Sequence, residues 1–80
     1  MGETELMWIR FMFDNAMAEG GIDLRQAVCE RKMTIHEILT IMCTSFLDDN
    51  LSDSCNDSMR LVLANLDQAA VYAAGILGLT

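Results

Sequence analysis

The residues of this chain best suited to chemistry lie in an acidic stretch near its middle. Asp48, Asn50 and Ser52 occupy the first, third and fifth ligand positions of a helix–loop–helix calcium site. The sixth position, where such a loop needs glycine for its turn, is Asp53, and the twelfth, which needs a bidentate glutamate, is Met59. The stretch therefore predicts a solvated acidic turn made of capping residues rather than a calcium site.

Histidine and cysteine are too few and too far apart to build a catalytic or zinc site. His36 and Glu37 begin a His-Glu-x-x-His pattern, but the chain has no second histidine. Cys29, Cys43 and Cys55 form no Cys-x-x-Cys pair and have spacings unsuited to zinc. Within one helix, His36 and Cys43 would stand about 10 Å apart at about 1.5 Å per residue, too far for a hydrogen bond. We therefore expect no enzyme activity, no metal and no cofactor.

Composition points to one small, acidic, intracellular domain. The chain has 80 residues, 52% of them hydrophobic, no proline and a formal net charge of −7. Such a charge disfavours direct nucleic-acid binding and favours basic protein partners. Three cysteines cannot all pair within one chain, and the opening residues show no secretion signal, so we expect a cytoplasmic protein. Cys29 and Cys43 fall in apolar helical patterns, which predicts that both are buried.

Hydrophobic spacing indicates an all-α domain that spans residues 1–80 as a small bundle of three to four helices. The first helix, residues 6–17, has a core stripe at helical spacing, namely Leu6, Ile9, Phe13, Ala16 and Met17. Gly20 and Gly21 are expected to end it, because glycine readily adopts left-handed backbone angles. Three large apolar residues lie outside the stripe, which leaves this helix apolar on nearly every side: Trp8, Phe11 and Met12.

Capping residues place the other helices. Asp23 is a candidate N-cap for a short second helix that serves as a connector. Thr34 and Glu37 form a capping box, so a third helix begins at Ile35. Ser52 or Ser54 is expected to cap the fourth helix.

The fourth helix is expected to be the longest, with Asp57 in its first turn. Its core stripe runs from Met59 to Leu77 and becomes rich in small residues. Ala70, Ala74 and Gly78 repeat at intervals of four, which favours packing within the chain and leaves self-association as the alternative.

The surplus apolar residues of the first helix predict a protein-binding surface. Aromatic and methionine side chains are favoured at interface centres, and Trp8, Phe11 and Met12 supply such area. We therefore predict a non-enzymatic regulator or adaptor that acts through this helix face. A homodimer with twofold symmetry is the first expectation for its assembly, and completion of the chain's own core is the alternative.

The acidic stretch predicts a different kind of binding. Asp48, Asp49, Asp53 and Asp57 could cover a basic surface on a nucleic-acid-handling complex. In size, in a sequence pI near 4.2 and in helical build, the chain resembles small phage-encoded inhibitors such as anti-CRISPR proteins, although no motif ties it to them. The resemblance implies an inhibitor that acts on a protein partner.

Overall fold

Five helices follow one another along the computed structural model, which describes residues 1–20 and 23–79. They are α1 (Glu3–Gly20), α2 (Leu24–Cys29), α3 (Ile35–Asp49), α4 (Asp53–Ala64) and α5 (Leu66–Ile76), and the described residues include no strand. The all-α prediction is confirmed. No helix in these two ranges has the combination of length and apolarity needed to cross a membrane.

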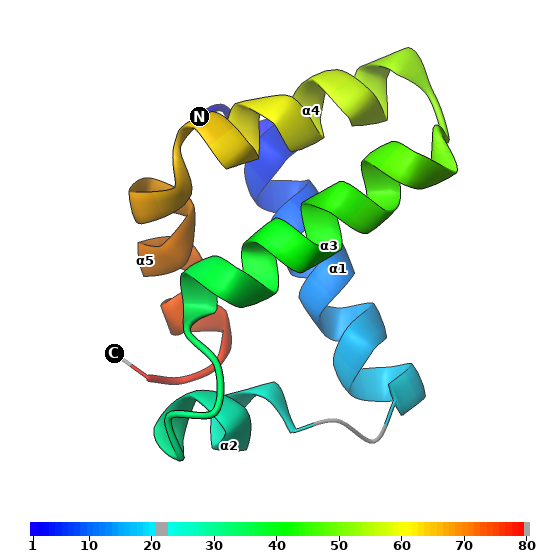
Figure 1. Ribbon diagram of the computed structural model, residues 1–80. Helices are drawn as coiled ribbons and strands as arrows, with labels where there is room; N and C mark the ends of the chain where they lie inside the picture. The colour runs from blue at the N-terminus through cyan, green and yellow to red at the C-terminus, as the bar shows by residue number, and fades with distance from the viewer. Residues whose placement is uncertain (21–22, 80) are drawn as a thin grey trace.

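Helices α3 and α4 form a hairpin, and α1 packs beneath it. Figure 1 shows α3 and α4 side by side and running in opposite directions, with α5 turning away at the end of α4. Helix α1 crosses this layer and contacts both α4 and α5, while α2 connects α1 to α3 at one end of the molecule. The short second helix therefore has the connecting role that the sequence predicts.

Local capping explains where three of the helices begin. The Asp23 side chain accepts from the Gln26 amide at 2.9 Å, and the Ser52 hydroxyl accepts from the Cys55 amide at 3.0 Å. Thr34 and Glu37 form the full capping box, with each side chain accepting from the other residue's backbone amide. These caps satisfy amides that have no partner inside a helix, so the predicted starts are confirmed.

The long fourth helix of the sequence prediction is divided in two at Asn65. This residue has φ −130° and ψ 43°, outside the helical region, and its side-chain amide donates to the Leu61 carbonyl oxygen at 2.8 Å. Asparagine favours such local bonds over helix continuation, which explains the break. As a result α1, with 18 residues, is the longest helix.

The start of α4 differs from the prediction in one detail, whereas the end of α1 at Gly20 agrees with it. Helix α4 begins at Asp53, so this residue provides the first-turn acid, and Asp57 lies one turn later. Helix α1 ends at Gly20, and Gly21 lies outside the described residues.

The core lies between α1 and the layer formed by α3, α4 and α5. Its buried hydrophobic members are Ile9, Met12, Phe13, Leu24, Ile38, Leu39, Cys43, Cys55, Met59, Val62, Ala69, Ala70, Ala73 and Leu77. The accessible surface is 4900 Å², close to the roughly 4800 Å² expected for a folded monomer of 8.9 kDa. The chain therefore buries as much surface as a monomer of its size should. Any excess of exposed apolar surface must come from which side chains stay outside, not from the total area exposed.

Two cysteine predictions have opposite outcomes. Cys43 is fully buried, as predicted, whereas the prediction for Cys29 is wrong because this residue is exposed at the end of α2. Helix α2 has only six residues and buries Leu24, so its other positions have little of the chain to pack against.

Candidate protein-binding surface

The outer side of α1 carries an exposed apolar groove. Met7 is 66% exposed and Phe11 is 49% exposed, and together with Thr4 and Trp8 they line a hollow of about 360 Å³. We call these four residues the α1 surface. They are spaced three and four residues apart, which places them on one side of the helix.

Aromatic contacts hold the α1 surface in place. The Trp8 ring lies edge-to-face against Phe11, with centroids 5.7 Å apart, and against Phe46 of α3 at 6.1 Å. Phe11 and Phe46 are 6.4 Å apart with the same type of geometry. Such pairs contribute about 0.5–1.5 kcal/mol beyond area burial, so the rings form a preformed surface rather than three free side chains.

The three apolar residues singled out by the sequence therefore separate. Trp8 is half-buried and Phe11 is exposed, but Met12 is only 3% exposed. The expectation that Met12 lies on a partner-binding face is wrong, because its side chain is buried in the core with Ile9 and Phe13. The predicted core stripe is otherwise confirmed, because Ile9 and Phe13 are fully buried and the other three members, Leu6, Ala16 and Met17, are partly buried against the core, which Met12 widens on one side.

Other exposed apolar residues are scattered. Ile41, Leu51, Leu61 and Val71 are more than two-fifths exposed and lie on α3, the turn after it, α4 and α5. Single exposed apolar residues are normal on folded proteins. The α1 surface differs because two such residues lie beside Trp8 in one hollow.

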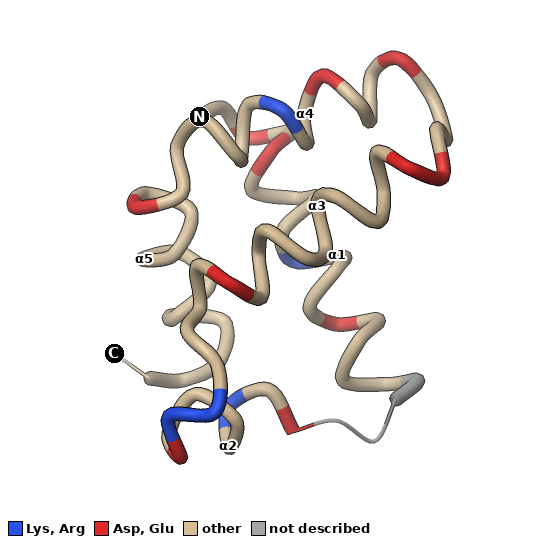
Figure 2. The backbone as a smooth tube through the Cα atoms, viewed as in Figure 1, with Lys and Arg blue, Asp and Glu red and all other residues tan. Residues whose placement is uncertain are grey.

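The four predicted acidic residues gather at the corner between α3 and α4. Asp48 and Asp49 end α3, while Asp53 begins α4 and Asp57 follows one turn later. Figure 2 shows this corner lined with acidic positions, at the far end of the molecule from the basic positions around α2. We call the four residues the acidic corner, and all of them are exposed.

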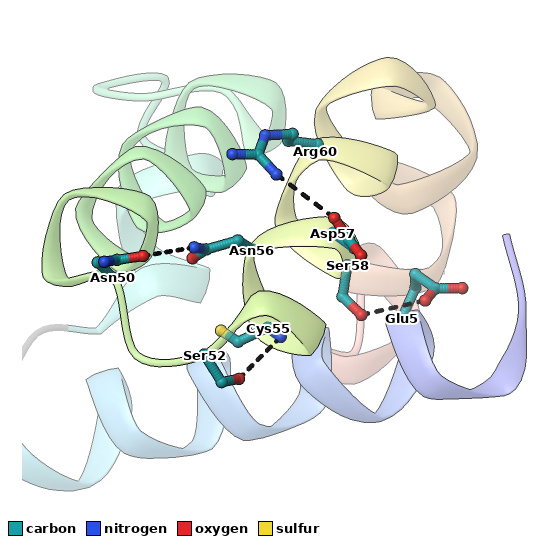
Figure 3. Close-up of polar contacts among 8 residues, drawn as sticks. All are labelled: Glu5, Asn50, Ser52, Cys55, Asn56, Asp57, Ser58 and Arg60. Atoms are coloured by element: carbon teal, nitrogen blue, oxygen red, sulfur yellow. Dashed lines mark hydrogen bonds and ion pairs between the residues drawn. The ribbon is translucent and has the colours of Figure 1, made fainter.

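The uncharged polar side chains next to the acidic corner stabilise the connection between α3 and α4. Asn50 ends α3 with a left-handed backbone, φ 49°, and its Oδ1 accepts from Asn56 Nδ2 at 2.7 Å (Figure 3). Asn56 is buried and its own Oδ1 has no partner among the described residues. Asp57 pairs with Arg60 at 3.4 Å, and no ion pair in the described ranges involves the other three acids.

Two long-range contacts between side chains of different helices were not foreseen from the sequence. Ser58 of α4 donates to the Glu5 carboxylate of α1 at 3.2 Å (Figure 3), and His36 Nε2 lies 2.8 Å from the Asp67 carboxylate of α5. Their partners are 53 and 31 residues apart, so no local pattern announces them. The first contact is part-buried and joins α1 to α4, whereas the second is exposed and joins α3 to α5.

Two of the three thiols, Cys43 and Cys55, lie in the core. Burial raises the pKa of the Cys43 thiol to about 11, with the nearby Cys55 adding to the shift, and burial also raises the pKa of Cys55. High pKa values keep thiols protonated and weakly nucleophilic. Over residues 1–20 and 23–79, no three side chains among His, Cys, Asp and Glu converge to hold a metal ion.

The surface of the molecule thus presents two candidate binding regions, one apolar and one acidic. Comparisons with protein-family models, with curated proteins and with solved structures gave no significant match.

Proposed function

We propose that this protein is a non-enzymatic binding protein, a regulator or adaptor that holds another protein on the α1 surface. The observation that carries the proposal is the pairing of exposed Met7 and Phe11 with the fixed Trp8 ring in one hollow. Large, rigid aromatic side chains and adaptable methionine are the residue types enriched at interface centres.

The energetic argument supports the same function. Leaving large apolar side chains in water forgoes about 25 cal/mol for each Å² that a partner would cover. The chain as a whole buries a normal share of its surface. The exposure of Met7 and Phe11 therefore does not result from incomplete burial of the chain.

A reducing compartment such as the cytoplasm suits this protein. All three cysteines are free thiols, and two of them are part of the packed core. Proteins whose cysteines remain free thiols are typical of reducing environments.

Site-specific photo-crosslinking tests the proposed function. A benzophenone amino acid replaces Met7 in one variant and Ile41, which is 57% exposed on α3, in a matched control. We expect illumination of cells that express the variants to give a discrete protein adduct from position 7 and none from position 41. Equal adducts at both positions, or none at position 7, would contradict the proposal.

A second candidate function is inhibition of a basic surface through the acidic corner. The observation in its favour is that Asp48 and Asp49 lie at the negative end of the α3 dipole, with no basic residue in the last turn. Placing two carboxylates there costs stability, and a basic partner would offset that cost. Binding of this kind should weaken steeply as salt rises from low to high ionic strength, whereas binding through the apolar α1 surface should be less sensitive to salt.

A further inference from the structure

The outer side of α1 has the spacing of a helix-pairing seam. Five exposed residues follow one another at alternating intervals of three and four, and we call them the outer seam: Thr4, Met7, Phe11, Asp14 and Ala18. This alternation is the pattern by which two helices pack side by side. The fully buried residues of α1, Ile9 and Phe13, lie on the opposite side, and Phe11 of the outer seam stays 49% exposed while one part of its ring packs on Trp8 and Phe46.

Two opposite charges lie along one side of the outer seam, next to its central residue Phe11. Arg10 and Asp14 are both exposed and stand one helical turn apart on the same side of Phe11. No ion pair in the described ranges involves either of them. A cation placed N-terminal to an anion at this spacing is the weaker arrangement within one helix, which leaves both charges available to a partner.

We propose that the outer seam pairs with the outer seam of a second copy of this chain, in an antiparallel arrangement about a twofold axis near Phe11. This inference rests on the proposed function and names its partner. The axis that brings Arg10 of each copy against Asp14 of the other also brings the two Phe11 rings together. The same surface thus supplies both members of each ion pair, which a twofold interface requires.

Charge selects the antiparallel orientation over the parallel one. In a parallel pair, the two copies of the seam residue Asp14 would face each other at the same level, which is a costly like-charge contact, while the two copies of Arg10 would lie on opposite edges of the interface without an acidic partner. In the antiparallel pair each contact joins opposite charges. Small Ala18 near one end of α1 and Thr4 near the other allow the two helices to approach closely along their length.

The dimer is expected to be weak. Helix α1 has 18 residues and is about 27 Å long, and one face of it covers less than the roughly 800 Å² that each partner contributes to a standard interface. An area of that size would be about a sixth of this molecule's 4900 Å². We therefore expect association in the micromolar range, with copies that exchange.

Charge-reversal variants of the full chain test the pairing by sedimentation velocity over about 10 to 500 µM protein, which brackets weak association. Arg10→Glu alone and Asp14→Arg alone should each weaken self-association by about tenfold or more, because each creates two like-charge contacts. An equimolar mixture of the two variants should associate again, because every contact between unlike copies then joins opposite charges. The glutamate introduced at position 10 faces the arginine introduced at position 14, and the native Asp14 of one copy faces the native Arg10 of the other. Weakening in each single variant together with rescue in the mixture indicates an antiparallel pair of α1 helices, because in a parallel pair neither reversal alone would add a like-charge contact.

Matched controls separate this contact from general charge effects. The first variant makes the net charge of −7 more negative by two, and the second makes it less negative by two, so general repulsion would change their association in opposite directions. Arg25→Glu within α2 and Glu30→Arg at the end of α2 repeat these changes on exposed positions elsewhere and should leave association as it is. Circular dichroism checks folding, and Arg10→Gln with Asp14→Asn repeats the test without repulsion if a reversal unfolds the chain.

The outcomes distinguish this inference from the proposed function. A chain that stays monomeric over the whole range, or a mixture that does not regain association, overturns the second copy as the partner. If position 7 still crosslinks to a different protein in cells, the proposed function stands while this inference fails. If both the association and the adduct are absent, both fail.

Discussion

The α1 surface and the acidic corner were both singled out by the sequence, and the fold treats them differently. At the acidic corner, Ser52 caps α4 and Asn50 ends α3, so the polar residues of the stretch are explained by helix ends. At the α1 surface, nothing in the fold uses the exposed side of Phe11 or the Met7 side chain. Helix ends therefore explain the polar residues of the acidic stretch, whereas the exposed aromatic area of α1 is explained by binding to a partner.

The largest expected effect on stability separates two phenylalanines on the two sides of α1. Phe13 is fully buried and Phe11 is 49% exposed. Phe13→Ala should lower the free energy of unfolding by about 3–5 kcal/mol, through lost burial and a cavity. Phe11→Ala should lower it by about 1 kcal/mol, the scale of its edge-to-face contacts. Urea unfolding of the two variants measures both values.

Equal losses from the two phenylalanine variants would contradict this difference between the two sides of the helix. If Phe11→Ala cost as much as Phe13→Ala, the exposed ring would be a structural residue, and the α1 surface would lose its claim to a binding role. A small loss of stability with a loss of association is the combination that supports a binding surface.

The two regions also differ in how far the sequence could predict them. The caps at Asp23, Thr34 and Ser52 were predictable because a cap bonds to amides three residues away. The break at Asn65 was not, because the apolar pattern continues across it on both sides. Nothing in the pattern showed that the asparagine side chain would bond to the Leu61 carbonyl oxygen.

The placement of the site residues depended on contacts distant in the sequence. Helical spacing identified α1 as apolar on most sides, but which residues face inward depends on where α4 and α5 pack against it. Met12 therefore lies in the core while Phe11 stays outside. The contact of Trp8 with Phe46, which fixes the α1 surface, joins two helices far apart in the chain.

The stability of the core is expected to depend on alkaline pH through the buried Cys43 thiol. The ordinary thiol pKa is 9.0, and burial raises that of Cys43 to about 11. Below pH 9 the thiol is protonated in both folded and unfolded chains, so stability is unaffected by this group. Between about pH 9 and 11 the unfolded chain releases the proton first, and the free energy of unfolding should fall. Unfolding in urea at pH 8, 9, 10 and 11 measures the slope.

The control for the alkaline test is Cys43→Ala, which removes the titrating group and should make the decline shallower. Cys55, whose pKa is also raised by burial, retains its own contribution in that variant. An unchanged slope would show that other groups cause the decline and that Cys43 is not the residue that links pH to stability.

The cap at the acidic corner gives a smaller effect. The Ser52 hydroxyl accepts from the Cys55 amide at 3.0 Å, and Ser52→Ala should reduce the free energy of unfolding by about 1 kcal/mol. Ser54→Ala is the matched control, because Ser54 is exposed within α4 and caps nothing. Equal effects in the two variants would remove Ser52 from its structural role.

The smallest effect separates the acids of the corner from one another. Asp49 ends α3 and Asp53 begins α4, so the two carboxylates meet opposite ends of helix dipoles. At low salt, Asp49→Asn should raise the free energy of unfolding by about 0.3–1 kcal/mol, and Asp53→Asn should lower it by a similar amount. Both effects should shrink in 1 M salt, where the screening length is about 3 Å.

Opposite signs in these two variants would mean that Asp49 is retained at a cost to the fold, which favours a role for the acidic corner in binding a basic partner. Two losses of stability would mean instead that both acids serve the fold. In that case the α1 surface would be the better supported of the two candidate binding regions.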